Sequence, residues 1–229
     1  GITISGGEVK ATSSHAGAGI GGGSDGNGES ITISGGNVEA TGGKYGAGIG
    51  GGLRGDGKTI TISGDAQVKA QGDTGGAGIG GGENASGNGI TISGGQVTAM
   101  GGQSGAGIGG GAGKEEGSGN VTVSGEAQVK VQGGAERGED ICRDGAPIGN
   151  GGYRPSGIGV PGDEITPDIS GLKVDGFIQY YDQYVDIKKA EPYKTTAGEV
   201  GDHSWDDGKV TTPATCTTPG VKTYTCQTD

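Results

Sequence analysis

Charged side chains of both signs gather in one segment of the chain, Gly133–Asp144, and shortly after it. Six of them form a candidate polar binding site: Arg137, Glu139, Asp140, Arg143, Asp144 and Arg154. Carboxylates beside an arginine can transfer protons and stabilise developing charge, which is the chemistry of polysaccharide lyases and glycoside hydrolases. A solvated surface loop has the same composition, and we favour that interpretation. We therefore predict no catalytic residues.

Aromatic side chains lie almost entirely after residue 152, with Tyr45 as the exception. Stacking on sugar rings is one role for them, and Tyr180 and Tyr181, beside Tyr184, are the candidate binding residues for it. The alternative, which we favour for this stretch, is that apolar residues cover the open end of a stacked core. The residues expected to do so are Phe177, Ile178, Tyr180 and Val185.

Two nucleotide-binding patterns occur in the chain. The sequence GAGIGG fits GxGxxG four times, and Gly52–Thr59 (GLRGDGKT) fits the phosphate-binding loop. Both patterns need a helix directly after the glycines, because its N-terminus binds the phosphate. Thr59 instead leads straight into the strand-like ITIS, so we interpret both matches as chance and predict no cofactor. The Arg54-Gly55-Asp56 tripeptide is likewise interpreted as a polar turn and not as an integrin ligand.

The chain has three cysteines. Cys216 and Cys226 flank a Pro-Gly turn, and a disulfide between them is the candidate pairing. A zinc site completed by a further cysteine is the alternative. Cys142 lies within the charged segment, where we expect a buried or free thiol. We predict no metal site from the residues present.

A repeat determines the elements that position these groups. The sequence GAGIGGG occurs at 17–23, 46–52, 76–82 and 105–111, and a degraded copy, GAPIGNGG, lies at 145–152. The copies begin 29, 30, 29 and 40 residues apart. Repeats of this length are typical of solenoids, in which each repeat is one turn of a continuous stack.

A strand motif such as Ile31–Val38 (ITISGGNV) precedes each copy. Apolar and polar residues alternate in three segments of every repeat, which predicts three strands per turn. The apolar positions then form rows of like residues stacked about 4.8 Å apart. In the second turn they are Ile31, Ile33, Val38, Ala40, Ala47 and Ile49. We predict an all-β fold, a right-handed parallel β-helix of about five coils with a C-terminal β cap or small module.

The outward positions differ between the three predicted faces. Threonine and serine rows follow the first strands. A row of partly alternating charge follows the second strands: Lys10, Glu39, Lys69, Thr98 and Lys130. Beside that row runs a mostly amide row: Glu8, Asn37, Gln67, Gln96 and Gln128. The third face has only glycine at its outward positions, so we expect a bare wall without side chains.

Composition divides the chain into three regions and excludes several partners. We expect a β-helix at 1–155, a capping or linking β segment at 156–200, and a short Cys-containing module at 201–229. The net charge of −11 disfavours nucleic acid and anionic membranes. Apolar runs of about 18 residues do not occur, so we predict no membrane insertion.

The last region resembles the short repeat of surface proteins from gut Firmicutes, with a pattern close to HxWDxGxVTxxATCxxxGxKTYTCxxCG. The matching positions are His203, Trp205, Cys216, Gly220, Tyr224 and Cys226. The sequence stops before the final Cys-Gly, so the repeat is expected to be truncated. This resemblance implies an extracellular location on the bacterial cell surface, either secreted or associated with the cell wall.

The coils are similar to clostridial carbohydrate-binding β-helix proteins, through the ITISGG-type strands of residues 1–150. That similarity implies a right-handed helix and polysaccharide recognition. Those coils carry an aspartate near a Gly-Ile pair, where this chain has Ala18, Ala47, Ala77 and Ala106. A calcium or catalytic role of that aspartate is therefore not transferred to this chain.

We expect a non-enzymatic extracellular surface module, a structural stalk or adhesin that contacts polysaccharide or a host glycan or protein. A polysaccharide lyase or glycoside hydrolase is the alternative, and it depends on the charged segment. A third possibility is an ice-binding solenoid, because the outward threonine rows present regularly spaced hydroxyl groups.

Overall fold

The computed structural model describes residues 1–114, 117–135, 144–153, 160–198, 209–212 and 221–223. These residues form strands, turns and loops, and no helix occurs among them. Contacts divide the chain into two compact units, Gly1–Gly198 and Glu199–Asp229. In the second unit, β16 (Lys209–Thr212) and β17 (Val221–Thr223) form an antiparallel hairpin. Cys142, Cys216 and Cys226 lie outside the described residues.

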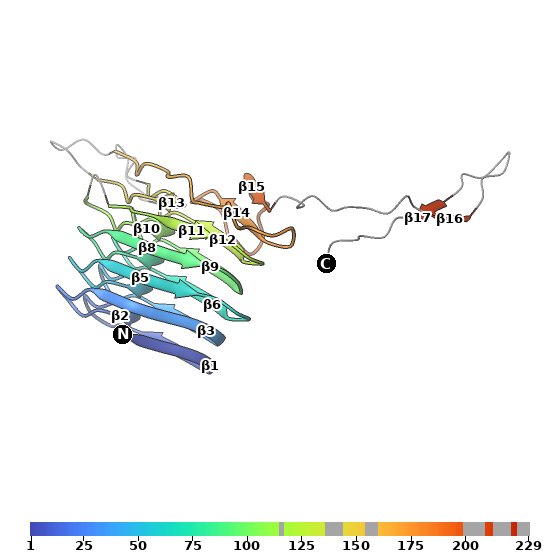
Figure 1. The fold of residues 1–229 in the computed structure, drawn as a ribbon. Coiled ribbons are helices and arrows are strands. Elements are labelled where there is room, and N and C mark those ends of the chain that lie inside the picture. The colour runs from blue at the N-terminus through green and yellow to red at the C-terminus, as the bar shows by residue number, and fades with distance from the viewer. Residues whose placement is uncertain (115–116, 136–143, 154–159, 199–208, 213–220, 224–229) are drawn as a thin grey trace. The chain divides into compact units, whose positions relative to one another are not determined.

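Two sheets, made mostly of parallel strands from successive stacked coils, build the first unit (Figure 1). The strands β1 (Ile2–Thr12) and β3 (Gly28–Thr41) run continuously around one corner of the coil. In later coils this long strand is divided in two, as β5 (Gly57–Ile62) with β6 (Gln67–Gln71), β8 (Gly87–Ile92) with β9 (Gln96–Met100), and β11 (Val121–Val123) with β12 (Gln128–Gln132). We call the two halves face one and face two, in chain order.

The second sheet forms face three, with one short strand from each of five coils. Its strands are β2 (Ile20–Gly21), β4 (Ile49–Gly50), β7 (Ile79–Gly80), β10 (Ile108–Gly109) and β13 (Ile148–Gly149). The strands pair in parallel, like residue to like residue. The prediction of an all-β parallel β-solenoid is confirmed, and its right-handed sense stays a prediction.

The predicted inward rows form the core. Ile31 pairs with Ile60 and Ile60 with Ile90, and all three are at most 1% exposed. Each fully buried isoleucine contributes about 1.5–3 kcal/mol to folding, so the stacked rows dominate the stability of the solenoid. In the first coil Ile2, Ile4, Val9 and Ala11 are only partly buried, because β1 has no described strand on its other side.

A sixth, partial coil follows the fifth. Three isolated bridges mark its path over faces three and one: Gly149↔Glu164, Thr122↔Asp168 and Gly125↔Leu172. β14 (Phe177–Tyr181) then pairs in parallel with β12, and β15 (Lys194–Ala197) pairs antiparallel with β14. Ile178 and Tyr180 are buried over the core rows of β12. Val185 is 38% exposed, so its predicted place in the apolar cap is wrong.

Face three is not the bare wall that the sequence predicts. Its glycines are buried from the second coil onward, as in Gly46–Gly52. A Cβ atom on Gly48 would lie 2.5 Å from the backbone nitrogen of Gln71. Gly57, at the start of β5 on face one, packs against Gly80 of face three, and a Cβ atom on it would lie 2.7 Å from the Cα of Gly80. Glycine is required there because the backbone of one segment lies directly against the backbone of another. The expected open surface for a partner is therefore absent from this face.

Alanine substitution distinguishes these packed glycines from exposed ones. Gly80 has a φ of +136°, and a Cβ atom there would overlap the carbonyl oxygen of Gly109. We expect Gly80→Ala to lower the free energy of unfolding by about 3 kcal/mol or more, as strain and overlap combine. The matched control is Gly23→Ala, because a Cβ atom on Gly23 meets nothing within 4 Å. Thermal unfolding followed by circular dichroism measures both, and equal melting temperatures for the two variants would contradict the packing.

Candidate functional site

The structure describes only one of the six residues of the predicted polar binding site, Asp144. Arg137, Glu139, Asp140, Arg143 and Arg154 lie outside the described residues. Asp144 Oδ2 accepts hydrogen bonds from Gln183 Nε2 at 2.9 Å and from the Tyr184 hydroxyl at 2.8 Å. Asp144 therefore fastens the turn after β14 to the fifth coil, and its role as a binding residue stays a prediction.

Tyr180 and Tyr181 do not form the sugar-stacking platform considered from the sequence. They are 1% and 3% exposed, so neither ring offers a free face. Tyr180 points into the core, and Lys194 Nζ lies 4.3 Å from its ring centroid. Tyr181 is on the outward side of β14, where the following turn covers it. Gln132, its strand neighbour, is bonded to that turn by Nε2, which donates to the carbonyl oxygens of Asp182 and Val185.

The phosphate-loop and Arg-Gly-Asp patterns are absorbed into the solenoid. Lys58 lies in β5, so no helix begins there. Arg54 binds Asp25 in the coil below, with Nε 2.7 Å from Oδ1 and an Nη2 hydrogen bond of 3.2 Å to Oδ2. Hydrogen bonds from Arg54 and Ser24 hold the pKa of Asp25 below its usual value. The Asp56 carboxylate is bound by the Ser86 backbone amide and by Lys58, so the group that an integrin would need is occupied.

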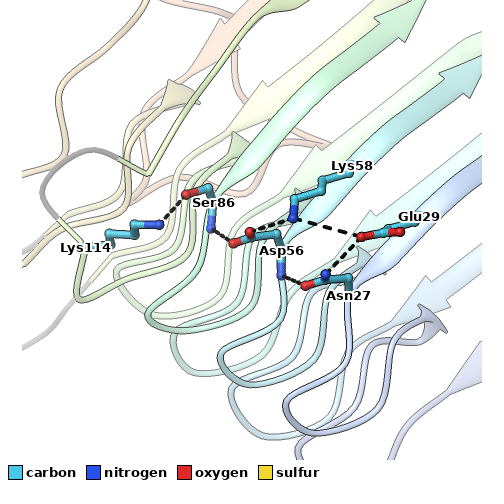
Figure 2. Close-up of polar contacts among 6 residues, drawn as sticks. All are labelled: Asn27, Glu29, Asp56, Lys58, Ser86 and Lys114. Atoms are coloured by element: carbon cyan, nitrogen blue, oxygen red, sulfur yellow. Dashed lines mark hydrogen bonds and ion pairs between the residues drawn. The ribbon is translucent and has the colours of Figure 1, made fainter.

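A polar ladder joins successive coils where each loop enters face one (Figure 2). The backbone nitrogen of Asp56 donates to Asn27 Oδ1 at 2.9 Å, and the nitrogen of Ser86 donates to Asp56 Oδ1 at 2.8 Å. Lys58 Nζ lies 3.1 Å from Asp56 Oδ2. At the top of the ladder, Lys114 Nζ donates to Ser86 Oγ at 2.6 Å. These bonds satisfy backbone groups that would otherwise be unpaired at the corner.

The electrostatics of this ladder favour a fixed charge. Partial burial of Asp56 raises its pKa. The hydrogen bond from the Ser86 amide and the Lys58 ammonium together lower the pKa by more, so it lies below the ordinary 3.8. A general acid for glycoside hydrolysis needs the opposite shift. The ladder is therefore a structural element that clamps coils together.

Acid titration tests the clamp. A carboxyl whose pKa is lowered by folding stabilises the folded state above its ordinary pKa of 3.8 and loses that contribution as pH falls through the folded value. Asp56→Asn keeps an oxygen for Ser86 but loses the ion pair, so we expect a loss of about 1 kcal/mol at pH 7. The difference from the parent should shrink as pH falls below 3.8.

The control for this titration is Asp175→Asn, since the Asp175 side chain makes no hydrogen bond or ion pair among the described residues. Melting temperatures of both variants and the parent are compared from neutral to acidic pH. A deficit of Asp56→Asn that stays constant with pH would contradict the charge-based clamp.

Face two presents outward side chains in exact register from coil to coil. The first row is Glu8, Asn37, Gln67, Gln96, Gln128 and Phe177. The second row is Lys10, Glu39, Lys69, Thr98, Lys130 and Gln179. The predicted alternation of charge is real, because Glu39 pairs with Lys10 at 3.4 Å and with Lys69 at 3.0 Å. The hydrogen bond from Lys69 is the main cause of a lowered pKa at Glu39.

A small groove lies on face two between its last coils. Its volume is about 150 Å³, and its lining side chains include Gln96, Thr98, Gln128, Lys130 and Phe177. Phe177 is partly exposed beside Gln128, its direct partner in the parallel pairing of β12 and β14. Sequence reasoning missed this aromatic residue as part of the amide row. Phe177 lies in this row because of the register of the sixth coil, and the sequence of that coil contains no repeat motif that would have predicted it.

No group of three or more metal-ligating side chains occurs among the described residues. None of the described segments is a helix long and apolar enough to cross a membrane.

Comparison with known families agrees with the coil geometry. Four segments, at residues 2–24, 31–53, 60–83 and 90–112, match the family model described as beta helix repeat. Each matched segment spans one coil, from its first strand to the end of face three. No curated protein matched the chain, and no solved structure did. The four matches cover less than half of the chain and show a similarity to beta helix repeats, which coincides with the first four stacked coils.

Proposed function

We propose that this chain is a non-enzymatic surface module, a rigid solenoid that contacts polysaccharide through face two. The observation that carries the proposal is the row of amide side chains in register on a parallel sheet, from Asn37 to Gln128, which ends at the partly exposed ring of Phe177. Part of the proposal is an extracellular location on a bacterial surface, supported by the likeness of the C-terminal pattern to surface-protein repeats.

The chemistry of face two suits a hydroxyl-rich polymer. An amide both donates and accepts hydrogen bonds, as a sugar hydroxyl does, so the second to fifth coils each offer a matching group. The coils repeat about every 4.8 Å along the stack, which is close to the length of one sugar residue in an extended glycan. Weak contacts that repeat along a polymer add to a useful avidity.

The state of the carboxylates supports a binding role over catalysis. Asp25 and Glu39 have pKa values below their ordinary range because each binds a cationic side chain. The pKa of Asp56 is also lowered, because the Ser86 amide and the Lys58 ammonium outweigh its partial burial. Such groups stay ionised and paired, whereas a catalytic acid must hold a proton near neutral pH. Their geometry suits a stable scaffold.

A glycan array probed with the full chain tests the proposal, followed by affinity electrophoresis on the polymers that bind. The double variant Gln67→Ala, Gln96→Ala removes the centre of the amide row, and we expect retention to weaken by about fivefold or more. The matched control is Thr32→Ala, Thr61→Ala, which truncates outward threonines on face one. Equal weakening of both variants would contradict binding through face two.

The same polymers, incubated with the chain, test the non-enzymatic part separately. We expect no new reducing ends and no unsaturated sugar products. Sustained product release that scales with protein concentration would overturn the proposal in favour of a lyase or hydrolase.

A further inference from the structure

We propose that the groove on face two, lined by Gln96, Thr98, Gln128, Lys130 and Phe177, binds an acidic sugar residue of a polysaccharide through its carboxylate. This inference rests on the proposed function and names the class of sugar that the face selects. Lys130 is the charged contact, and Phe177 is the stacking surface.

The charge pattern of face two leaves Lys130 available. Lys10 and Lys69 both pair with the carboxylate of Glu39, so each already has an anionic partner within the sheet. Continued alternation would place an acid between Lys69 and Lys130, but Thr98 stands there. Lys130 is exposed, and no ion pair joins it to a carboxylate among the described residues.

The local field differs from that of the whole chain. The net charge of −11 would repel an acidic polymer from most of the surface. In the two outward rows given above, three lysines stand against two glutamates, and both glutamates lie in the first two coils. The positive end of face two is therefore at the groove, and charge complementarity directs an anionic group to Lys130.

The other lining groups fit the rest of a sugar ring. The outward face of Phe177 can stack on the C–H face of a pyranose, as aromatic rings do at carbohydrate sites. Gln96 and Gln128 lie in adjacent coils and offer amides to ring hydroxyls. The groove volume of about 150 Å³ is below the roughly 300 Å³ of sites for drug-sized ligands. It therefore takes one sugar of a polymer whose remaining residues lie along the amide row.

Calorimetric titration of the full chain with two matched probes tests the inference. The probes are a β-1,4-linked glucuronate hexamer and cellohexaose, which share a backbone and differ in the carboxylate group. At about 150 mM salt, where exposed charges are largely screened beyond about 8 Å, we expect the acidic probe to bind at least about fivefold more tightly. Methyl esterification of its carboxylates should abolish this preference.

Variants assign the preference to the groove. Lys130→Gln should reduce the affinity for the glucuronate probe to that for cellohexaose, and Lys130→Arg should retain the difference. Phe177→Ala should weaken both probes. The matched control is Lys10→Gln, which removes a lysine of the same row that is paired with Glu39. Melting temperatures of all variants verify that the stack is intact.

Each other outcome has a separate meaning. Equal binding of both probes by the parent would overturn the acidic preference and leave the proposed function standing. Equal losses with Lys130→Gln and Lys10→Gln would show diffuse attraction and overturn the groove. Failure of the glycan array with every polymer, acidic or neutral, would overturn the proposed function itself.

Discussion

Direct contact between backbones, with no side chain between them, is the constraint on which the rest of this solenoid depends. At one corner Gly57 lies against Gly80, and at another Gly48 lies against the end of the next second-face strand at Gln71. A methyl group at either glycine would overlap main-chain atoms. The corners therefore fix how closely the three faces meet and leave room for aliphatic rows between them.

The tight corners hold successive coils in one register, and that register gives the outer surface its order. Asn27, Asp56 and Ser86 meet as a ladder because each occupies the same place in its own coil. The amide row of face two forms for the same reason. In the ladder the aligned groups form hydrogen bonds with each other and hold the coils together. In the amide row they face outward and remain available to a ligand.

The sequence predicted the rows but not the ends or the corners. Alternation identifies Ile49 or Val68 as inward, because period two leaves only one choice when like residues recur. The same alternation made the glycines look outward and bare, since a pattern of letters does not show that another backbone fills the space. Tyr181 is outward as its position in β14 requires, yet a turn without a repeat motif buries it. Phe177 lines the groove for the same reason, since it belongs to the sixth coil, which has no repeat motif.

The most direct test of this account is a nuclear Overhauser measurement between glycines on the full chain. A Cβ atom on Gly57 would lie 2.7 Å from the Cα of Gly80, so the α-protons of these two residues must be close. Selectively labelled protein should show a strong α-proton cross-peak between Gly57 and Gly80, and its counterpart between Gly28 and Gly50. Absence of both cross-peaks, in protein whose parallel strand pairing is otherwise observed, would contradict backbone contact as the basis of the stack.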